Sequence, residues 1–519
     1  MAELMMASTE RIDEARGRIE AAYDADVLHD AGGRLVELLT EHWRRLESCQ
    51  GPVLPWRAPP ENVAEAAGSL EEHLPSGASG AAIVQRFADL VTLMLRRGHN
   101  LHDPRYIGHQ VAASVPLAGL FDAVGAITNQ VMAIYDMGPW ATAAEWALVD
   151  RLGRAIGWRG GEFAGVATHG GSLANLTALL TARNVALSEC WEQGCWGDRG
   201  SKADRRAALV VHADAHYSVS RAAGVLGLGT AQVVRVALDA RRRMDPARLE
   251  GTLRELQREG RPVVAVVACS CSTPVGAFDP LTDIADVCGR HGVWLHVDAA
   301  HGGSACLSRR HRHLVAGLER ADSVVWDAHK MLFVPSLCAF VFLRDKARQF
   351  EAFRQEAPYL FDPTAPGLAE YDSGLRTVEC TKRAAAFGLW GLWATFGPRL
   401  FEDLVDVTFD RGKTFFQKLT EAPDFEPLHE PECNIVVFRH VPIALNNAPL
   451  EQLGAFQLAL RRRVIESGEF YIVSTKVHGV GALRATVINP LTTPDHIDQL
   501  LESLRRHGRQ ILESADCPG

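Results

Sequence analysis

The chain has 519 residues, of which 47% are hydrophobic and 23% are charged, and its formal net charge is −9. These proportions are typical of a folded soluble protein, and the length exceeds what one hydrophobic core usually serves, so we expect two or more subdomains. The negative charge disfavours nonspecific binding to nucleic acid or to an anionic membrane. No run approaches 18 uninterrupted apolar residues, and the first residues lack the plan of a signal peptide. We therefore expect a cytoplasmic protein that does not bind membranes.

The chain contains 11 cysteines, scattered along its length and in several cases inside apolar runs. The number is odd and the chain has no paired CxxC units, so a disulfide framework is disfavoured. We expect reduced and mostly buried thiols. A metal site is not expected either, because the arginines interleaved in Arg309–His313 would repel a cation and favour a solvated basic turn.

The first 100 residues are predicted to be helical, because apolar residues recur at helical spacing in segments 35–46 and 83–94. From 207 to 343 the pattern changes to short apolar runs separated by amphipathic segments. Continuous apolar runs of this kind predict a mostly parallel sheet that is covered on both faces. The predicted strands are Ala208–Val211, Val233–Val236, Val263–Ala268, Val293–Val297, Ser323–Trp326 and Ala339–Leu343, and the helices between them include Pro246–Arg258 and Leu281–His291.

Segment 351–375 carries several prolines and glycines and few periodic apolar residues, which is more typical of a functional loop than of filler. After about residue 396, strands and a last helix over 494–512 predict a smaller α+β domain. The predicted organisation is thus a helical segment at 1–100, a large α/β domain at 101–395 and a small C-terminal domain at 396–519.

Two polar residues stand directly after predicted strands. Asp298 follows the run that ends at Val297, and Lys330 follows the run that ends at Trp326. A lone lysine is most often solvated, and a lone aspartate at a strand end is often a helix cap or a core hydrogen-bond acceptor. Together they form the pair that an enzyme needs to hold the aldehyde cofactor pyridoxal 5′-phosphate (PLP), with the amine bound to the aldehyde and the carboxylate beside the pyridine nitrogen. We expect desolvation of Lys330 to ease loss of its proton.

Further candidates lie elsewhere in the chain. Gly170, Gly171 and Ser172 precede the helical pattern of 173–186, and backbone N–H groups at a helix N-terminus suit a phosphate. On its own this segment is equally well a helix-capping turn. His216, after the strand at 208–211, could stack on a planar cofactor, but it too is unremarkable in isolation.

The chain resembles the group II PLP-dependent amino-acid decarboxylases, which include glutamate, cysteine-sulfinate, diaminobutyrate and aromatic amino-acid decarboxylases. The resemblance covers roughly residues 100 to 512. Several motifs in the family's order and spacing carry it: His216-Tyr217-Ser218, Gly276-Ala277-Phe278-Asp279-Pro280, His296-Val297-Asp298-Ala299-Ala300, His329-Lys330, Tyr359-Leu360-Phe361, and Leu483-Arg484-Ala485-Thr486 with Asn489-Pro490.

The resemblance implies the PLP-dependent transferase fold of type I, which is aspartate-aminotransferase-like, with a mainly parallel seven-stranded sheet and a small C-terminal α+β domain. It also implies a homodimer with shared active sites. The implied catalytic residues are Lys330 as the Schiff-base lysine, Asp298 as the partner of the ring nitrogen, His216 stacked on the ring and Tyr359 as the proton donor to the substrate carbon. The implied cofactor contacts are Gly171, Ser172, His216, Thr273, Asp298, Ala300, His329 and Lys330. The implied substrate contacts are Arg484, which grips a carboxylate, and His109 and Gln110.

Two residues depart from the family's pattern. Asp327 stands where the family commonly has asparagine, which places an acidic group near the expected phosphate position. His301 stands where an aromatic residue often follows the Asp-Ala-Ala triplet, which changes the packing or the polarity of the pocket.

The function implied is decarboxylation of an L-amino acid to its amine and CO2. Residues 371–380 lean slightly toward the acidic and diamino branches of the family. One alternative is an aldehyde synthase, in which decarboxylation is coupled to oxidative deamination, although retention of Tyr359 and His216 favours simple decarboxylation. Another PLP-dependent lyase or an aminotransferase is a second alternative. A catalytically silent scaffold is a third, which the presence of Lys330 and Asp298 disfavours.

Overall fold

The computed structural model describes residues 2–75, 77–195, 206–354 and 369–514. Contacts divide the chain into two compact units. The first comprises 1–107, 459–472 and 495–517, and the second comprises 108–458 and 473–494 with the last two residues. Each unit is described by itself. The predicted boundaries after residues 100 and 395 stay a prediction.

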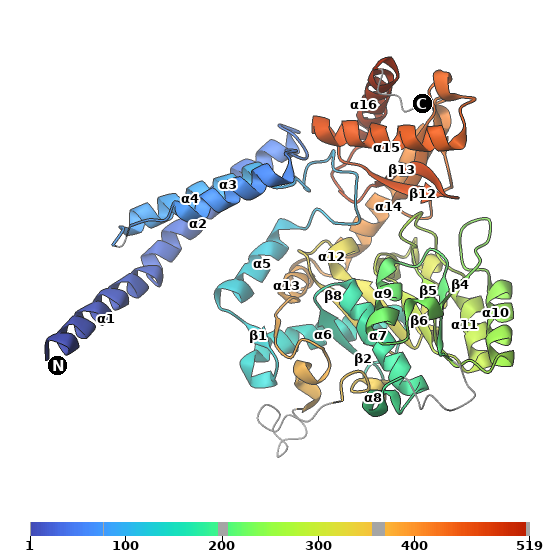
Figure 1. Ribbon diagram of the computed structural model, residues 1–519, viewed down its shortest axis with the longest axis horizontal. Coiled ribbons are helices and arrows are strands. Elements are labelled where there is room, and N and C mark those ends of the chain that lie inside the picture. The colour runs from blue at the N-terminus through green and yellow to red at the C-terminus, as the bar shows by residue number, and fades with distance from the viewer. Residues whose placement is uncertain (1, 76, 196–205, 355–368, 515–519) are drawn as a thin grey trace. The chain divides into compact units, whose positions relative to one another are not determined.

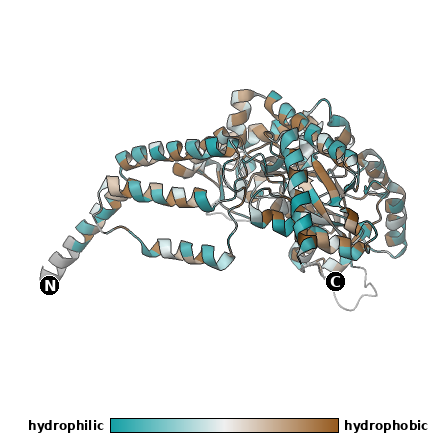
Figure 2. Ribbon diagram, turned by 90° about the horizontal axis from the view of Figure 1, so that it is seen from above, coloured by the Kyte–Doolittle hydropathy of each residue, from teal (hydrophilic) through white to brown (hydrophobic). Residues whose placement is uncertain are grey.

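The first unit is helical, as predicted for residues 1 to about 100. Helices α2 and α4 pack against each other and bury Leu46, Ala88 and Val91. Hydrophobic and hydrophilic residues alternate along these helices, as Figure 2 shows by colour. Helix α4 begins after Ser79, whose hydroxyl accepts a hydrogen bond from the backbone N–H of Ala82 and so caps the helix. The helices are α1 (Ala2–Ala22), α2 (Ala25–Glu47), α3 (Pro59–Glu71), α4 (Gly80–Arg97) and, apart from its first residue, α16 (Pro494–Glu513).

The second unit is built on a seven-stranded sheet (Figure 1). Six strands run parallel to one another, and β8 runs antiparallel between β2 and β7. This confirms the predicted mainly parallel seven-stranded sheet. In sheet order the strands are β2 (Ala164–Thr168), β8 (Ala339–Leu343), β7 (Ser323–Asp327), β6 (Leu295–Asp298), β5 (Val263–Cys269), β3 (Ala208–His212) and β4 (Val233–Val236).

Strand β2 is the one that the apolar pattern did not reveal, because its sequence Ala-Gly-Val-Ala-Thr is made mostly of small residues. Close packing explains why this strand has a glycine at position 165, because a Cβ there would lie 2.8 Å from the ring of Phe342 and 3.0 Å from Val149. Strand β6 begins at Leu295, two residues later than predicted, because Gly292 ends the preceding helix in a left-handed conformation and Val293 still donates a hydrogen bond to its last turn.

Helices connect the strands and cover the sheet. Helix α7 packs against β5, β7 and β8, α6 packs against β2, and α10 packs against α11. The helices of this unit are α5 (Pro116–Ile127), α6 (Pro139–Ile156), α7 (Gly171–Ala186), α8 (Cys190–Gln193), α9 (Tyr217–Val225), α10 (Pro246–Arg258), α11 (Leu281–His291), α12 (Ala328–Met331), α13 (Phe387–Phe396), α14 (Arg399–Glu421) and the first part of α15 (Leu450–Ser467). Among the described residues, no helix is long and apolar enough to cross a membrane.

Two further sheets belong to this unit. One has four antiparallel strands in the order β10 (Phe425–Pro427), β11 (Ile435–His440), β13 (Val480–Thr486) and β12 (Val473–Val477), and α14 packs on β10 and β11. The other is the short antiparallel pair β1 (Val131–Met132) and β9 (Lys382–Arg383).

A buried ion pair links β9 to α6 and β2. The ammonium of Lys382 lies 2.9 and 2.7 Å from the two carboxylate oxygens of Glu145 and donates a third hydrogen bond to the carbonyl of Ala167 at 2.7 Å. Both side chains are 1% exposed. Burial lowers the pKa of Lys382, and the Glu145 carboxylate only partly offsets this effect. Each of the two buried charges is therefore stabilised by the other.

We predict that Glu145→Gln lowers the free energy of unfolding by about 3–5 kcal/mol, because it leaves the Lys382 ammonium buried without a counter-charge. Urea denaturation of the two proteins measures the difference. Arg154→Ala on the same helix is the control, since the Arg154–Asp150 pair is exposed and its loss should leave the denaturation midpoint within error. Equal midpoints for Glu145→Gln and the wild type would contradict a stabilising role for the pair.

Candidate active site

The carboxyl ends of β5, β6 and β7 meet at one edge of the large sheet, because the three strands are parallel neighbours. Asp298 is the last residue of β6, and Lys330 lies in the short helix α12 directly after β7. Helix α7 starts at the same edge after β2. A cavity of about 310 Å³ opens there, within the size range of small-molecule sites. It is lined by Gln110, His169, Gly170, Gly171, Ser172, Asn175, His216, Cys269, Cys271, Ser272, Thr273, Asp298, Ala300, His301, Asp327, His329, Lys330 and Leu337.

The structure thus gathers all eight residues that were expected to contact a cofactor, together with Gln110, around one cavity. Arg484 is buried on β13, and its Nη2 donates a 2.8 Å hydrogen bond to Oε1 of Gln110. His109 is exposed and does not line the cavity. Tyr359 lies outside the described residues.

The Asp298 carboxylate is buried and accepts a hydrogen bond at each of its two oxygens. Its Oδ2 accepts a hydrogen bond from Nδ2 of Asn175 at 3.0 Å, and its Oδ1 accepts one from the backbone N–H of Ala300 at 3.2 Å. The same Asn175 amide donates its other hydrogen to Oγ of Ser218 at 3.0 Å. These bonds satisfy a buried charge and hold it in one orientation.

Two histidines extend this network and are neutral. Burial lowers the pKa of His296 to about 4, so its Nε2 donates to Oδ1 of Asn175 at 2.9 Å while its Nδ1 accepts from the hydroxyl of Ser323 at 2.9 Å. Burial also lowers the pKa of His216, whose Nδ1 accepts hydrogen bonds from the hydroxyl and the backbone N–H of Ser218. A continuous chain of hydrogen bonds therefore runs from His296 to His216.

The pKa of Lys330 shifts in the direction opposite to the one predicted. Burial does lower its pKa, as predicted, but the neighbouring carboxylates of Asp327 and Asp298 reverse the effect, so the net shift is upward. Asp327 lies closest, with 3.0 Å between its Oδ2 and the Lys330 Nζ. The prediction that desolvation alone would favour the neutral amine is wrong, because it ignored these two anions.

The start of α7 packs tightly against Asp327. A Cβ on Gly171 would lie 2.7 Å from both carboxylate oxygens of Asp327, so only glycine fits there. The preceding Gly170 has φ +103°, a conformation that favours glycine. The first N–H groups of this 16-residue helix line the cavity at its positive end, which suits the phosphate of PLP. Asp327 Oδ1 is buried and has no hydrogen-bond partner among the described residues, so a neighbouring hydrogen-bond donor is still needed there.

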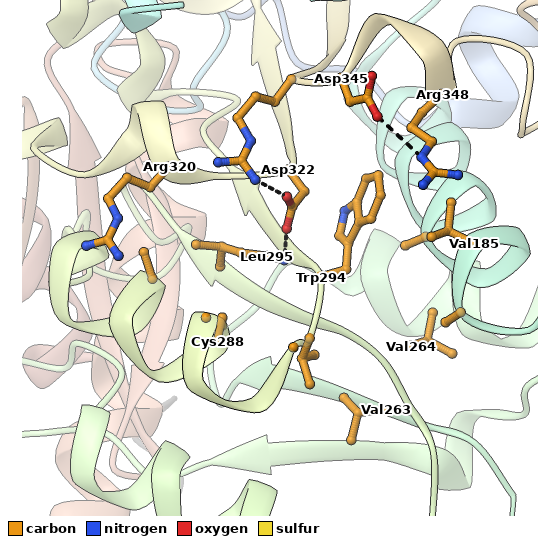
Figure 3. Close-up of a pocket in the computed structure, with 17 residues that line it drawn as sticks. Val185, Val263, Val264, Cys288, Trp294, Leu295, Arg320, Asp322, Asp345 and Arg348 are labelled. Carbon is orange, nitrogen blue, oxygen red and sulfur yellow. Dashed lines mark hydrogen bonds and ion pairs between the residues drawn. The ribbon is translucent and has the colours of Figure 1, made fainter.

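A second cavity, of about 600 Å³, lies at the opposite end of the sheet, beside the first residues of β5 and β6 (Figure 3). Its charged groups already neutralise one another: Arg320 pairs with Asp286, Arg344 with Asp322, and Arg348 with Asp345. Burial raises the pKa of the Cys288 thiol in its wall to about 12. The residues expected to contact a cofactor line the smaller cavity instead.

Sequence comparison identifies the family. Residues 71–441 match the model of the "Pyridoxal-dependent decarboxylase conserved domain". The chain belongs to the pyridoxal-dependent decarboxylase family. It is 32% identical over 496 residues to cysteine sulfinic acid decarboxylase from Rattus norvegicus. This alignment covers 93% of this chain and 96% of the relative. It is 30% identical over 467 residues to acidic amino acid decarboxylase GADL1 from Bos taurus, covering 88% and 87%.

Solved structures agree with this assignment. The crystal structure of mouse CSAD matches with a TM-score of 0.82 and 31% identity, over 93% of this chain and 98% of that one. The structure of Oryza sativa TDC with PLP and tryptamine has a TM-score of 0.84 at 23% identity, over 94% and 99%, and shows the shared fold. The type I PLP fold predicted from the sequence is thereby confirmed. The protein is a PLP-dependent amino-acid decarboxylase.

The sequence alone did not single out Asn175 or His296 as parts of the site. Asn175 lies near the start of α7, after the Gly-Gly-Ser segment and outside any recognised motif, and His296 lies in an apolar strand, where a core histidine is the ordinary interpretation. One signal was available: both side chains are polar at positions whose neighbours predict burial, and a buried polar group needs a partner. Nothing in their spacing shows that they are each other's partners.

We predict that Asn175→Asp weakens PLP binding by at least about tenfold, or about 1.4 kcal/mol. The new carboxylate would face that of Asp298, and like charges in a buried site repel strongly. Titration of the purified apoenzyme with PLP, followed by absorbance, measures the affinity, and the thermal midpoint shows whether the variant is folded. Thr177→Val is the matched control, because Thr177 lies on the same helix but its hydroxyl donates to the backbone carbonyl of Leu173 in that helix. Wild-type affinity in Asn175→Asp would show that the network does not position Asp298.

Proposed function

We propose that this decarboxylase acts on a small L-amino acid with an acidic side chain and releases the corresponding amine and CO2. The observation that supports this most directly is the identity of 30% or more, over most of the chain, to cysteine sulfinic acid decarboxylase and to acidic amino acid decarboxylase GADL1. The site is compatible with an anionic substrate, since Arg484 adjoins the cavity wall through Gln110.

The residues around the cavity fit PLP, and each has a proposed role. Bound PLP supplies an electron-accepting ring that stabilises the electron pair left behind when CO2 departs. Lys330 would hold the cofactor covalently through its Nζ, and Asp298 would keep a proton on the ring nitrogen. Neutral His216 and Ala300 would contact the ring, while Gly171, Ser172 and His329 would hold the phosphate. These assignments rest on the family resemblance and on the common cavity that the side chains line.

The electrostatics of the site suit these roles. Because Asn175 fixes the Asp298 carboxylate and His296 stays neutral, Asp298 faces the cavity as an anion that can hold a proton on a bound heterocycle. Asp327 lies 3.0 Å from the Lys330 Nζ and stabilises its ammonium form. Tyr359 remains the proposed donor of the proton to the substrate carbon, on the family resemblance alone. Simple decarboxylation is favoured over aldehyde synthesis, because the relatives at 30% identity or more are named as decarboxylases.

A panel of L-amino acids with detection of CO2, amine and aldehyde tests this proposal. We expect kcat/KM for cysteine sulfinate, aspartate or glutamate to exceed that for diamino and aromatic substrates by at least about a hundredfold, because a charged substrate group without its partner costs several kcal/mol. Amine should equal CO2, with no stoichiometric aldehyde.

Two variants sharpen this experiment. Lys330→Ala should abolish turnover, which shows that the CO2 comes from this site. Arg484→Met should raise KM for the preferred acidic substrate, because the cation beside Gln110 is lost. Preference for an aromatic or diamino substrate would contradict the acidic assignment, and aldehyde equal to CO2 would contradict simple decarboxylation.

We also propose that the protein is a homodimer. The family resemblance implies it, and helices α1 and α2 expose apolar side chains that a second copy could cover. On α2, Leu28 and Val36 are each 55% exposed, and Leu39 is 39% exposed; on α1, Ile12 and Ile19 are 55% and 57% exposed. The three α2 residues fall on one face of the helix, at spacings of eight and three.

Sedimentation equilibrium tests the dimer. We predict that the wild type sediments at twice the chain mass and that the double change Leu28→Glu with Val36→Glu shifts it toward the monomer, because two charges would be buried in an apolar contact. Glu37→Ala on another face of α2 is the control. A dimer unaffected by the double change would exclude this face from the interface, and a monomeric wild type would contradict the dimer itself.

A further inference from the structure

Two cysteine thiols meet at the wall of the active-site cavity. The Sγ atoms of Cys271 and Cys433 lie 3.6 Å apart, although 162 positions separate them in the sequence. Both residues are buried, at 7% and 1% exposed, and both are free thiols in this structure. Cys271 follows β5 at the carboxyl edge of the sheet, and Cys433 precedes β11 of the four-stranded sheet. The pair thus joins the cavity wall to a second element of the same compact unit.

Cys271 occupies an unusual backbone position. Its φ of +75° falls in the left-handed region, which favours glycine and disfavours a residue with a Cβ. A side chain retained there at an energetic cost indicates a function for that side chain. Cys271 also lines the cavity, whereas Cys433 is not one of the residues that line it.

Cys433 is held in place by its surroundings. Its Sγ lies 3.7 Å from the carbonyl oxygen of Gly276, and a Cβ on Gly276 would lie only 2.7 Å from that sulfur. The next residue, Asn434, bonds through Oδ1 to Nε2 of His301 at 2.9 Å and contacts the sulfur of Met331, the neighbour of Lys330, at 3.5 Å. A displacement of Cys433 would therefore reach both His301 and the segment that carries Lys330.

We propose that Cys271 and Cys433 form a reversible disulfide when a hydroperoxide enters the cavity, and that this disulfide lowers decarboxylase activity. The Cys271 sulfur attacks the O–O bond of the peroxide and becomes a sulfenic acid, releasing an alcohol, or water from hydrogen peroxide. The Cys433 sulfur then attacks the sulfenic sulfur, and water leaves as the S–S bond forms. The two thiols together lose two electrons, which the peroxide gains.

The geometry requires a small movement. A disulfide has an S–S length of about 2.05 Å, so the two sulfur atoms, now 3.6 Å apart, must approach by roughly 1.5 Å. Since Cys433 is packed against Gly276, part of this movement falls on Cys271 and thus on the cavity wall. Burial raises the pKa of Cys271 well above its ordinary value, so the thiol predominates at neutral pH and oxidation should be slow and should accelerate as the pH rises.

The test is peptide mapping of the PLP-loaded enzyme after treatment with hydrogen peroxide, under non-reducing conditions. We expect a cross-linked peptide pair that contains Cys271 and Cys433 and is lighter by two hydrogen atoms than the two reduced peptides together. We also expect kcat/KM to fall by about tenfold or more, since a displacement of about 1 Å at a site can cost up to about a hundredfold. Dithiothreitol should reverse both changes.

Two single variants provide the controls. Cys433→Ala should retain basal activity and lose the cross-link and the reversible inactivation, and Cys433→Ser gives a second version should the alanine protein fold poorly. Cys288→Ala removes a buried thiol from the other cavity and should respond to peroxide like the wild type. Absence of the cross-linked peptide, or equal reversible inactivation of Cys433→Ala and the wild type, would overturn the proposal. A cross-link without loss of activity would overturn its regulatory part. None of these readouts depends on which amino acid is the substrate.

Discussion

The active site depends on one buried carboxylate at the carboxyl edge of a parallel sheet. An anion at the end of an apolar strand is costly unless hydrogen-bond donors surround it. Asp298 obtains one from the nearby backbone, at Ala300, and the other from Asn175 near the start of α7. Because this bond fixes α7 against β6, it also fixes the N-terminus of α7, where the phosphate is proposed to lie. The same hydrogen bond therefore stabilises the Asp298 charge and positions the N-terminus of α7.

The protonation state of Lys330 depends on two opposing effects. Burial favours a neutral Lys330 and the two neighbouring aspartates favour its ammonium, and the aspartates prevail. A protonated lysine cannot attack an aldehyde, so the cofactor-free site stores its nucleophile in an ion pair with Asp327. If Lys330 held PLP through its aldehyde, Asp327 would lose this ammonium partner.

The sequence predicted the fold well where one physical signal dominates. Continuous apolar runs indicated six of the seven strands of the large sheet, and polar residues at the strand ends indicated Asp298 and Lys330. Strand β2 escaped because small residues, chosen for close packing against Phe342, carry little apolar signal. The upward pKa shift of Lys330 could not be predicted from the sequence, because it depends on the distance between Lys330 and Asp327. Asn175 escaped because only the fold brings it to Asp298, 123 positions away.

The same reasoning explains why chemistry is easier to infer than specificity. The proposed catalytic pair, Asp298 and Lys330, follows strand ends, and the parallel arrangement of β6 and β7 brings such ends together wherever they occur in the chain. The residues proposed to determine substrate specificity lie in segments that do not share this parallel arrangement. Arg484 lies on an antiparallel strand and meets Gln110 across 374 positions, and Cys271 meets Cys433 across 162. Such contacts leave no periodic trace, so changes there can alter the substrate or the redox response while the sheet and its catalytic edge stay the same.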